Sequence, residues 1–384
     1  MKLRIGIGVA AAGSLIGAAS LLLSQTAPEP VTRPASWKMQ YFYDEDKSEL
    51  TITDLEFQSV TSGAACGVIT YERKRPQGVV LLTRDGGVTW KQVQAPDVPI
   101  DIQFVDDSQV FLLTDKGIYK SEERGLEWKK LKGMAGLNAI HFLDSKRGFV
   151  AGVRKQLLAT EDGGKTWTPV AEAAKPSAKP EFTSYNWIAF RKDGRGIVLG
   201  GSTPPRPRDL PVPAWADPEA AMKQREWPKL SIALETTDGG KNWKSDTAPV
   251  FGRMAKLRFG PAESPLAMSL LRYDHAFDYS AEVHLVHWVS GKSAPIFARK
   301  DSFVTDVGFT GAKSGFLAAI ERPGTMAQSP LPGKLRIHGS ADLSLWTEMP
   351  VDYRAVGTFA TMSVVDAGHA WVALDSGMIL HLTR

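Results

Sequence analysis

The sequence of 384 residues is poor in cysteine, and its charges are nearly balanced. The single cysteine, Cys66, excludes an intramolecular disulfide framework and a zinc site built from cysteines, and it cannot mispair in an oxidising compartment. A formal net charge of +4 is too small to indicate a nucleic-acid-binding protein, so we expect no nucleic-acid partner. A content of 43% hydrophobic residues predicts a folded chain with a large core.

The sequence also lacks the short motifs of common catalytic sites: it has no nucleophile elbow, no P-loop and no HExxH pair. Two clusters remain as candidates, namely Glu282, His284 and His287 in "AEVHLVHW", and Asp274, His275 and Asp278 in "RYDHAFDY". In a strand, His284 and His287 point to opposite faces, which argues against a shared metal. The second cluster is typical of a solvated loop. We therefore expect no catalytic residue, no metal and no cofactor.

One long apolar run lies at the N-terminus. After the basic start "MKLR", residues 5–23 are 19 uncharged and mostly apolar residues, which is typical of an export signal. This length also approaches the ~20 residues of a membrane-spanning helix, so residues 1–23 are either a cleaved signal peptide or a retained signal anchor. The proline-rich residues 24–35 suit a linker. In both cases we expect the folded part to be extracytoplasmic, periplasmic or secreted, with membrane contact only through a retained anchor.

A repeated octet is the strongest feature of the sequence. It occurs as "TRDGGVTW" (83–90), "TEDGGKTW" (160–167) and "TTDGGKNW" (236–243), with degenerate copies "SEERGLEW" (121–128) and "SADLSLW" (340–346). Short alternating or β-branched segments bounded by Gly and Asp surround each copy, which predicts four antiparallel strands per unit of ~40 residues. Such a unit is a β-propeller blade.

The units predict an all-β, seven-bladed β-propeller over residues 36–384. We place its blades at 54–96, 101–133, 138–171, 185–248, 253–300, 303–351 and 358–384. The last unit has only three strands, whereas "SWKMQYFYD" (36–44) resembles the strands that follow the octets. The N-terminal strand is therefore predicted to complete the last blade, which removes the open edges of the ring.

The octet suits the hairpin between the third and fourth strands. Its aspartates can accept backbone N–H groups of their own turn, its glycines allow positive φ, and its tryptophans can fill the space beneath. We interpret it as a folding element rather than a ligand or calcium site. The residues concerned are Asp85, Trp90, Trp128, Asp162, Trp167, Asp238, Trp243, Asp342 and Trp346.

The octets match the Asp-box (BNR) signature S/T-x-D-x-G-x-T-W of sialidases, sortilin-type receptors and the Ycf48 family of photosystem II assembly factors. An export signal, seven units and a closing N-terminal strand most resemble the Ycf48 family, and this resemblance implies a non-enzymatic assembly factor for a membrane complex. The early "F/Y-R-I-P" signature of sialidases is absent from the first strands "LEFQSV" and "IQFVDD". A carbohydrate-active propeller, either a lectin or a sialidase-like hydrolase, is the alternative.

Insertions between the second and third strands should emerge on the face opposite the octets, and function tends to concentrate on such loops. This looped face is predicted to be basic, either as a solvated rim or as a docking surface for a protein partner, possibly a membrane complex. In the long insert, two tryptophans bracket a short predicted helix and either pin the insert to its blade or anchor a partner. The candidate partner-binding residues are Arg73, Lys74, Arg75, Arg154, Lys155, Arg206, Arg208, Trp215, Trp227, Arg272 and Arg322. We expect a monomer.

Overall fold

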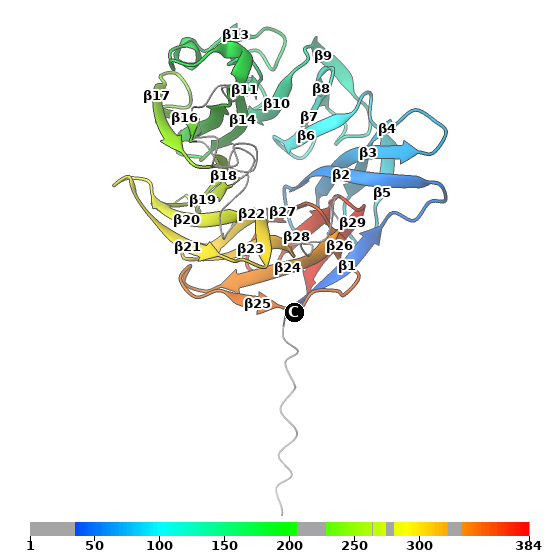
Figure 1. The fold of residues 1–384 in the computed structure, drawn as a ribbon. Coiled ribbons are helices and arrows are strands. Elements are labelled where there is room, and N and C mark those ends of the chain that lie inside the picture. Colours follow the sequence, from blue (N-terminus) through cyan, green and yellow to red (C-terminus); the bar gives the residue numbers. More distant parts are fainter. Residues whose placement is uncertain (1–34, 206–227, 263, 274–279, 322–331, 384) are drawn as a thin grey trace, which may run out of the picture. The chain divides into compact units, whose positions relative to one another are not determined.

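Each repeat folds into an antiparallel sheet, and the seven sheets are the blades of a propeller. The computed structural model describes residues 35–205, 228–262, 264–273, 280–321 and 332–383. Within these residues every sheet has four main strands, and one sheet carries an additional short strand; the strands follow in sequence order in six sheets, whereas in the seventh the first strand of the chain pairs with the last. Figure 1 shows the blades following one another around a common centre. The predicted seven-bladed fold is confirmed.

The first four blades contain the strands β2 to β17. Blade 1 consists of β2 (Ser48–Phe57), β3 (Gly63–Tyr71), β4 (Gln77–Thr83) and β5 (Lys91–Gln94), and blade 2 of β6 (Pro99–Phe104), β7 (Val110–Thr114), β8 (Gly117–Ser121) and β9 (Lys129–Gly133). Blade 3 consists of β10 (Leu137–Phe142), β11 (Gly148–Gly152), β12 (Leu157–Thr160) and β13 (Thr168–Pro169), and blade 4 of β14 (Thr183–Phe190), β15 (Gly196–Ser202), β16 (Lys229–Thr236) and β17 (Lys244–Val250). The short 3₁₀ helices η1 (Ala171–Ala174) and η2 (Pro180–Phe182) connect blade 3 to blade 4.

The last three blades contain the strands β18 to β29 and one strand from the start of the chain. Blade 5 consists of β18 (Arg253–Phe259), β19 (Leu266–Arg272), β20 (Ala281–His287) and β21 (Lys292–Ala298). Blade 6 consists of β22 (Ser302–Gly311), β23 (Ser314–Glu321), β24 (Gly333–Ser340) and β25 (Thr347–Met349), and β26 (Val356–Gly357) also pairs with β24. Blade 7 consists of β27 (Ala360–Val364), β28 (Ala370–Leu374), β29 (Met378–Thr383) and β1 (Ser36–Phe42).

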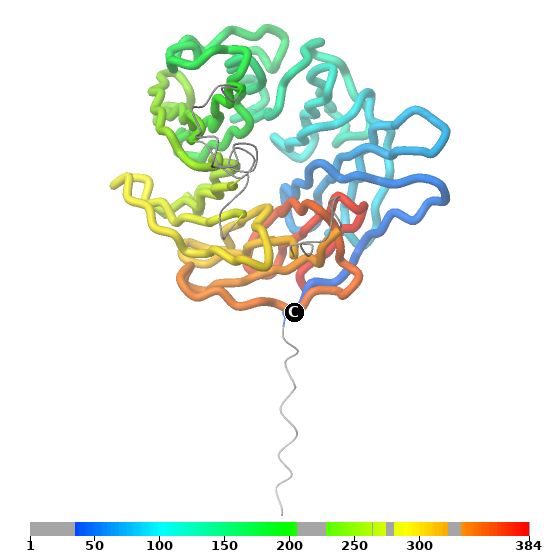
Figure 2. The backbone as a smooth tube through the Cα atoms, viewed as in Figure 1, coloured from blue at the N-terminus to red at the C-terminus, as the bar shows by residue number. Residues whose placement is uncertain are grey.

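The N-terminal strand closes the ring, as the sequence predicted. β1 pairs antiparallel with β29, and Trp37 lies opposite Leu382 in this ladder. Figure 2 shows the blue N-terminal strand beside the red C-terminal strand. The Trp37 side chain is 1% exposed and contacts the ring of Phe316 in blade 6 edge-on, at 5.5 Å between centroids. The first and last strands of the domain are therefore joined by hydrogen bonds and by a shared core.

Blade 1 begins earlier than the sequence predicted. β2 starts at Ser48 rather than at residue 54, because Lys47 takes a left-handed conformation (φ 56°) that turns the chain directly from the closing strand into β2. The added residues continue the strand alternation, since Leu50 and Ile52 are buried while Thr51 is exposed.

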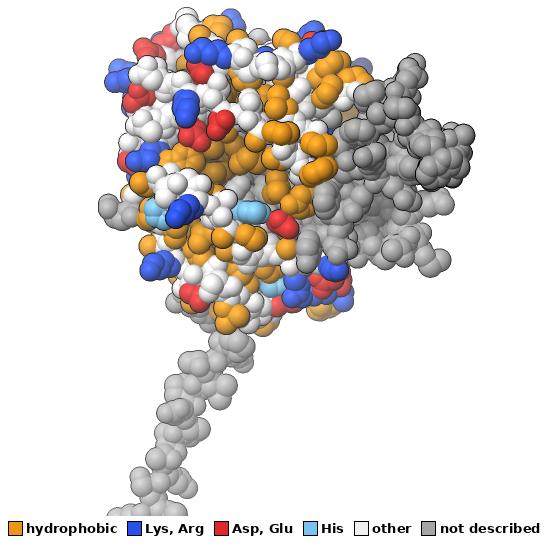
Figure 3. Space-filling view, turned by 60° about the vertical axis from the view of Figure 1, so that its left-hand side comes forward, with side chains coloured by type: hydrophobic (Ala, Val, Ile, Leu, Met, Phe, Trp, Pro, Cys, Tyr) orange, Lys and Arg blue, Asp and Glu red, His pale blue; other side chains and the backbone are white. Residues whose placement is uncertain are grey.

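Each interface between blades has its own apolar cluster, and the clusters differ in size. The cluster between blades 4 and 5 contains four buried residues, the fewest of the clusters among the described residues: Ile197, Leu199, Leu257 and Ala267. Figure 3, turned so that the left-hand side of Figure 1 comes forward, shows apolar side chains among the polar ones on this part of the surface. Blade 5 lacks the octet, so no octet tryptophan fills its outer hairpin; Trp288 packs edge-on against Phe259 instead.

Candidate functional site

The first strands of the blades carry polar side chains toward the axis of the ring. In β2, β6, β10, β14, β18 and β22 the pairing with the second strand shifts by one residue at the same position. The bulge is followed by a repeated tetrapeptide whose second and fourth residues enter the apolar clusters, and whose first and third residues lie on the other face of the strand, toward the next blade. Its copies are "DLEF" (54–57), "DIQF" (101–104), "AIHF" (139–142), "WIAF" (187–190), "KLRF" (256–259) and "DVGF" (306–309).

Side chains of these tetrapeptides, together with Asn138 and Ser363, link every blade to the next. Asp54, Glu56, Asp101 and Gln103 accept backbone N–H groups of the following blade, from Ile102 (3.2 Å), Phe104 (2.6 Å), Ile140 (2.9 Å) and Phe142 (2.6 Å). Asn138 and Trp187 instead donate to carbonyl oxygens, of Tyr185 (3.1 Å) and Leu257 (3.0 Å). Lys256 pairs with Asp306 (2.7 Å), Asp306 accepts the N–H of Met362 (3.0 Å), and Ser363 accepts that of Phe57 (2.8 Å). The axial polar residues are therefore first of all structural.

An axial cavity of about 560 Å³ lies between these tetrapeptides. Its lining on blades 1 and 2 includes the carboxyl groups of Asp54, Glu56 and Asp101. Burial raises the pKa of Glu56 to about 8, and burial together with the neighbouring Asp54 raises the pKa of Asp101 well above its usual value. Glu56 is therefore mostly protonated at neutral pH, and the same causes favour the protonated form of Asp101.

The opposite wall of the axial cavity is cationic and aromatic. The guanidinium of Arg258 lies 4.8 Å from the ring centre of Trp187 and 3.5 Å from Asp306. Burial works against the ionisation of Asp306, but the charges of Lys256 and Arg258 hold its pKa below the usual value. His141, stacked on Phe190, completes the wall; burial lowers its pKa to about 4, so its imidazole is neutral. Sequence reasoning missed this site, and the repeated tetrapeptide was the signal that could have revealed it.

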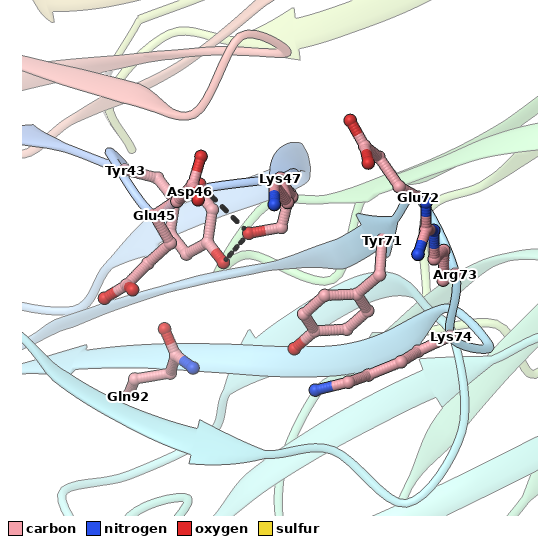
Figure 4. A pocket seen from close by; sticks show the side chains of 10 residues that line it. Tyr43, Glu45, Asp46, Lys47, Tyr71, Glu72, Arg73, Lys74 and Gln92 are labelled. Carbon is pink, nitrogen blue, oxygen red and sulfur yellow. Dashed lines mark hydrogen bonds between the residues drawn. The ribbon is translucent and has the colours of Figure 1, made fainter.

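The looped face contains part of the predicted partner-binding set. Arg73, Lys74 and Arg75 are exposed in the loop that precedes β4, whereas Asp85 follows β4 at its other end, so this loop lies opposite the octet. Arg73 and Lys74 border a second cavity of about 560 Å³. Figure 4 shows Lys74 alongside the ring of Tyr71, and its Nζ lies 5.4 Å from the ring centre.

This loop pocket is less basic than the sequence suggested. Glu45, Asp46 and Lys47 of the turn between β1 and β2 line its other side (Figure 4), and Tyr43 and Ser48 fix that turn through a hydrogen bond of 2.9 Å between their hydroxyl groups. An acidic turn therefore lies beside the basic loop, because ring closure brings the N-terminal hairpin next to blade 1.

The remaining predicted residues are dispersed. Arg154 is exposed at the equivalent turn of blade 3, whereas Lys155 donates to the carbonyl oxygens of Ala174 (3.2 Å) and Pro176 (2.6 Å) and so fixes a loop. Arg272 is partly buried and donates to the carbonyl of Thr305 at 3.2 Å. Arg206, Arg208, Trp215, Trp227 and Arg322 lie outside the described residues, as do Asp274, His275 and Asp278.

The octet aspartates bind their own turns. Asp162 accepts the backbone N–H and the hydroxyl of Thr166 at 2.9 and 2.7 Å, and these hydrogen bonds lower its pKa to about 2. Asp85 and Asp238 make the corresponding bonds, and Asp342 accepts two backbone N–H groups of its shorter turn. In blade 2, which has Glu123 in place of the aspartate, Ser121 still accepts the N–H of Gly125.

The octet tryptophans are partly buried and pack edge-on against a ring at the same interface. Such pairs include Trp90 with Phe57, Trp167 with Phe142, Trp243 with Phe149 and Trp346 with Phe297. Trp167 and Trp243 also donate Nε1–H to the carbonyl of an octet glycine, Gly164 and Gly240. The indole nitrogens of Trp90, Trp128 and Trp346 have no such partner. The octets thus combine a hydrogen-bonded turn with an aromatic contact.

Neither a metal site nor a membrane span is found in the part of the chain that the structure describes. Its histidines, cysteine and acidic residues form no group of three able to hold a metal ion; Glu282 and His284 form a pair at 3.1 Å. Among the same residues, no helix combines the length and apolar character that crossing a bilayer requires.

Comparison with known proteins supports the predicted resemblance in fold. No family model matches the sequence. A solved structure described as YCF48 bound to D1 peptide aligns with a TM-score of 0.57 at 12% identity, over 90% of this chain and 100% of that chain. The chain has the fold of a Ycf48 propeller.

Two curated relatives match shorter stretches of the sequence. The chloroplastic photosystem II stability/assembly factor HCF136 of Arabidopsis thaliana is 30% identical over 135 residues, which cover 33% of this chain and 26% of that protein. Vacuolar protein sorting/targeting protein 10 of Verticillium alfalfae is 31% identical over 103 residues, which cover 25% of this chain and 7% of that protein. The matched stretches thus span only a minor part of either relative.

Proposed function

We propose that this chain is a non-enzymatic, extracytoplasmic β-propeller that binds a protein partner and assists the assembly of a membrane complex. The observation that carries the proposal is the fold likeness, over 90% of the chain, to a propeller solved with a peptide bound. The match to a chloroplast assembly factor supports the same role, and the apolar N-terminal run supports export.

The geometry of the axial carboxyl groups also favours binding over catalysis. Asp54, Glu56 and Asp101 each use one oxygen to hold the next blade, so they are parts of the ring. The partner-binding surface that we propose is the looped face around Arg73, Lys74 and the loop pocket. Exposed long cations beside an acidic turn offer a surface of mixed charge, which orients a partner through electrostatic complementarity.

The experiment is capture of partners from detergent-solubilised membranes with the full chain as bait, followed by mass spectrometry. We expect the double variant Arg73→Gln/Lys74→Gln to retain at least about fivefold less partner, with an unchanged melting temperature because both residues are exposed. The matched control, Lys165→Gln/Lys241→Gln, removes the same charge from two octet turns on the opposite face. Equal loss in both double variants would contradict the assignment of the looped face.

A carbohydrate-binding propeller is the second candidate, and the axial cavity favours it. The carboxyl group of Glu56, a glutamine and the indole of Trp187 line that cavity, and polar groups beside an aromatic surface suit a polyol. A glycan array separates the two functions. Specific glycan binding, with no protein retained from membranes, would replace the first proposal.

A further inference from the structure

The axial cavity separates unpaired acidic groups from a cationic wall. Asp54, Glu56 and Asp101 line it from blades 1 and 2, and none of the three forms an ion pair with another residue that the structure describes. Arg258 lines the same cavity from blade 5. An axial cavity with acidic groups on one wall and a guanidinium on the other is complementary to a ligand that carries both charges.

The carboxyl groups have capacity left for a ligand. The blade links occupy Oδ2 of Asp54, Oε2 of Glu56 and Oδ2 of Asp101. Among the described residues, no N–H group donates a hydrogen bond to the second oxygen of any of these three carboxyl groups. A hydrogen bond between the carboxyl groups of Asp54 and Asp101 contributes to the raised pKa of Asp101. An ammonium group can bind these oxygens through charge-assisted hydrogen bonds.

Arg258 also has capacity left. Its nearest counter-charge is Oδ2 of Asp306 at 3.5 Å, and that oxygen already accepts Lys256 Nζ (2.7 Å), the Thr361 hydroxyl (3.2 Å) and the Met362 N–H (3.0 Å). One carboxylate thus serves two cations. A guanidinium presents five donors, so Arg258 can bind a further carboxylate from the axial cavity while it stays over Trp187.

We propose that the axial cavity binds a zwitterion, a free amino acid or a short peptide, with its ammonium group toward Asp54, Glu56 and Asp101 and its carboxylate toward Arg258. The cavity volume of about 560 Å³ lies in the range of small-molecule sites. This site goes beyond the proposed function, because it requires neither the looped face nor a protein partner.

Binding at this site is coupled to proton release. Burial raises the pKa of Glu56 to about 8, while the amide of Phe104 and the charge of Arg258 lower it and the charge of Asp54 raises it. The other titratable or charged residues that line the cavity are Asp101 on β6, His141 on β10, and Arg191 and Lys192 after β14. An ammonium group stabilises the ionised carboxylate, so binding should tighten from pH 6 to pH 7, a range in which the α-amino group of a peptide stays protonated. The heat of binding should also depend on the ionisation enthalpy of the buffer.

The test is isothermal titration calorimetry of the full chain with triglycine, N-acetyltriglycine, triglycine amide and free glycine. We expect triglycine or glycine to bind and each blocked peptide to bind at least about tenfold more weakly, since each loses one charged contact. The glycine and triglycine titrations distinguish a free amino acid from a peptide as the ligand. The proposal fails if neither binds at millimolar concentration, if the blocked peptides bind equally well, or if a neutral trisaccharide binds more tightly.

Three variants of similar side-chain size test which wall of the axial cavity binds the ammonium group and which binds the carboxylate. Asp101→Asn and Glu56→Gln keep an oxygen for the N–H groups of Ile140 and Phe104, so the blades stay linked while the ionisable group is lost. We expect both variants to weaken the binding of triglycine and of triglycine amide, which carry an ammonium group, but not the binding of N-acetyltriglycine, which has none. The Arg258→Gln variant should bind triglycine and triglycine amide equally well, because the guanidinium that binds the carboxylate is gone. Melting temperatures identify any variant that fails to fold, and each of the three variants tests the site independently.

Binding of triglycine at the axial cavity can be tested separately from partner binding at the looped face. Arg73→Gln/Lys74→Gln should reduce partner capture and leave triglycine binding unchanged, because these residues lie in the loop pocket and not in the axial cavity. If that double variant lost triglycine binding, the ligand would lie on the looped face and the axial site would be wrong.

Discussion

Replacing Trp37 with alanine should open the ring at its closing strand. Trp37 lies on β1, is 1% exposed, and packs between blades 6 and 7 against Phe316 at 5.5 Å. A buried indole removes roughly 200 Å² from water, and at ~25 cal/mol per Å² this contributes about 5 kcal/mol. Truncations of buried aromatic residues cost about 3–5 kcal/mol, so we expect a loss in that range. The cost should also lower cooperativity, since β1 is the outer strand of blade 7.

The assay is equilibrium denaturation in guanidinium chloride, followed by tryptophan fluorescence and by circular dichroism. Trp37→Phe is the matched control: it keeps an aromatic ring and removes an indole N–H that has no hydrogen-bond partner, so it should cost much less. If Trp37→Ala and Trp37→Phe unfold at the same denaturant concentration as the natural protein, the closing strand does not hold the ring together. β1 would then complete blade 7 but add little to the free energy of unfolding.

Three further predictions concern pH and the blade links. Because the folded state raises the pKa of Glu56 from 4.5 to about 8, its contribution to stability is complete below pH 4.5 and is lost as pH rises through 8; Glu56→Gln should flatten the fall in melting temperature between pH 5 and pH 8. The pKa of Asp162 is lowered to about 2, so its contribution is present above pH 4 and lost toward pH 2, and Asp162→Asn should melt with less dependence on pH in that window. Ser363→Ala leaves the N–H of Phe57 without its acceptor and should cost about 1–3 kcal/mol in chemical denaturation, whereas Ser363→Thr should retain most of the stability.

The sequence by itself determined the architecture. The octet and its degenerate copies predicted the blades, because a hairpin of Asp, Gly and Trp is formed within one segment and depends little on the rest of the chain. The likeness of residues 36–44 to the strands after the octets predicted the closing strand, and β1 pairs with β29 as expected. These features are local or repeated, so a single sequence is sufficient to reveal them.

The candidate sites depended on distances that no local pattern contains. Asp54 and Arg258 are about two hundred positions apart along the chain, and only the closed ring places both on one axial cavity. The same closure places the turn with Glu45 and Asp46 beside Arg73 and Lys74, so a charge count by segment predicted a more basic surface than the fold presents. Sequence specifies which side chains each blade carries. Ring closure decides which of them meet, because the axis is built from one strand of every blade.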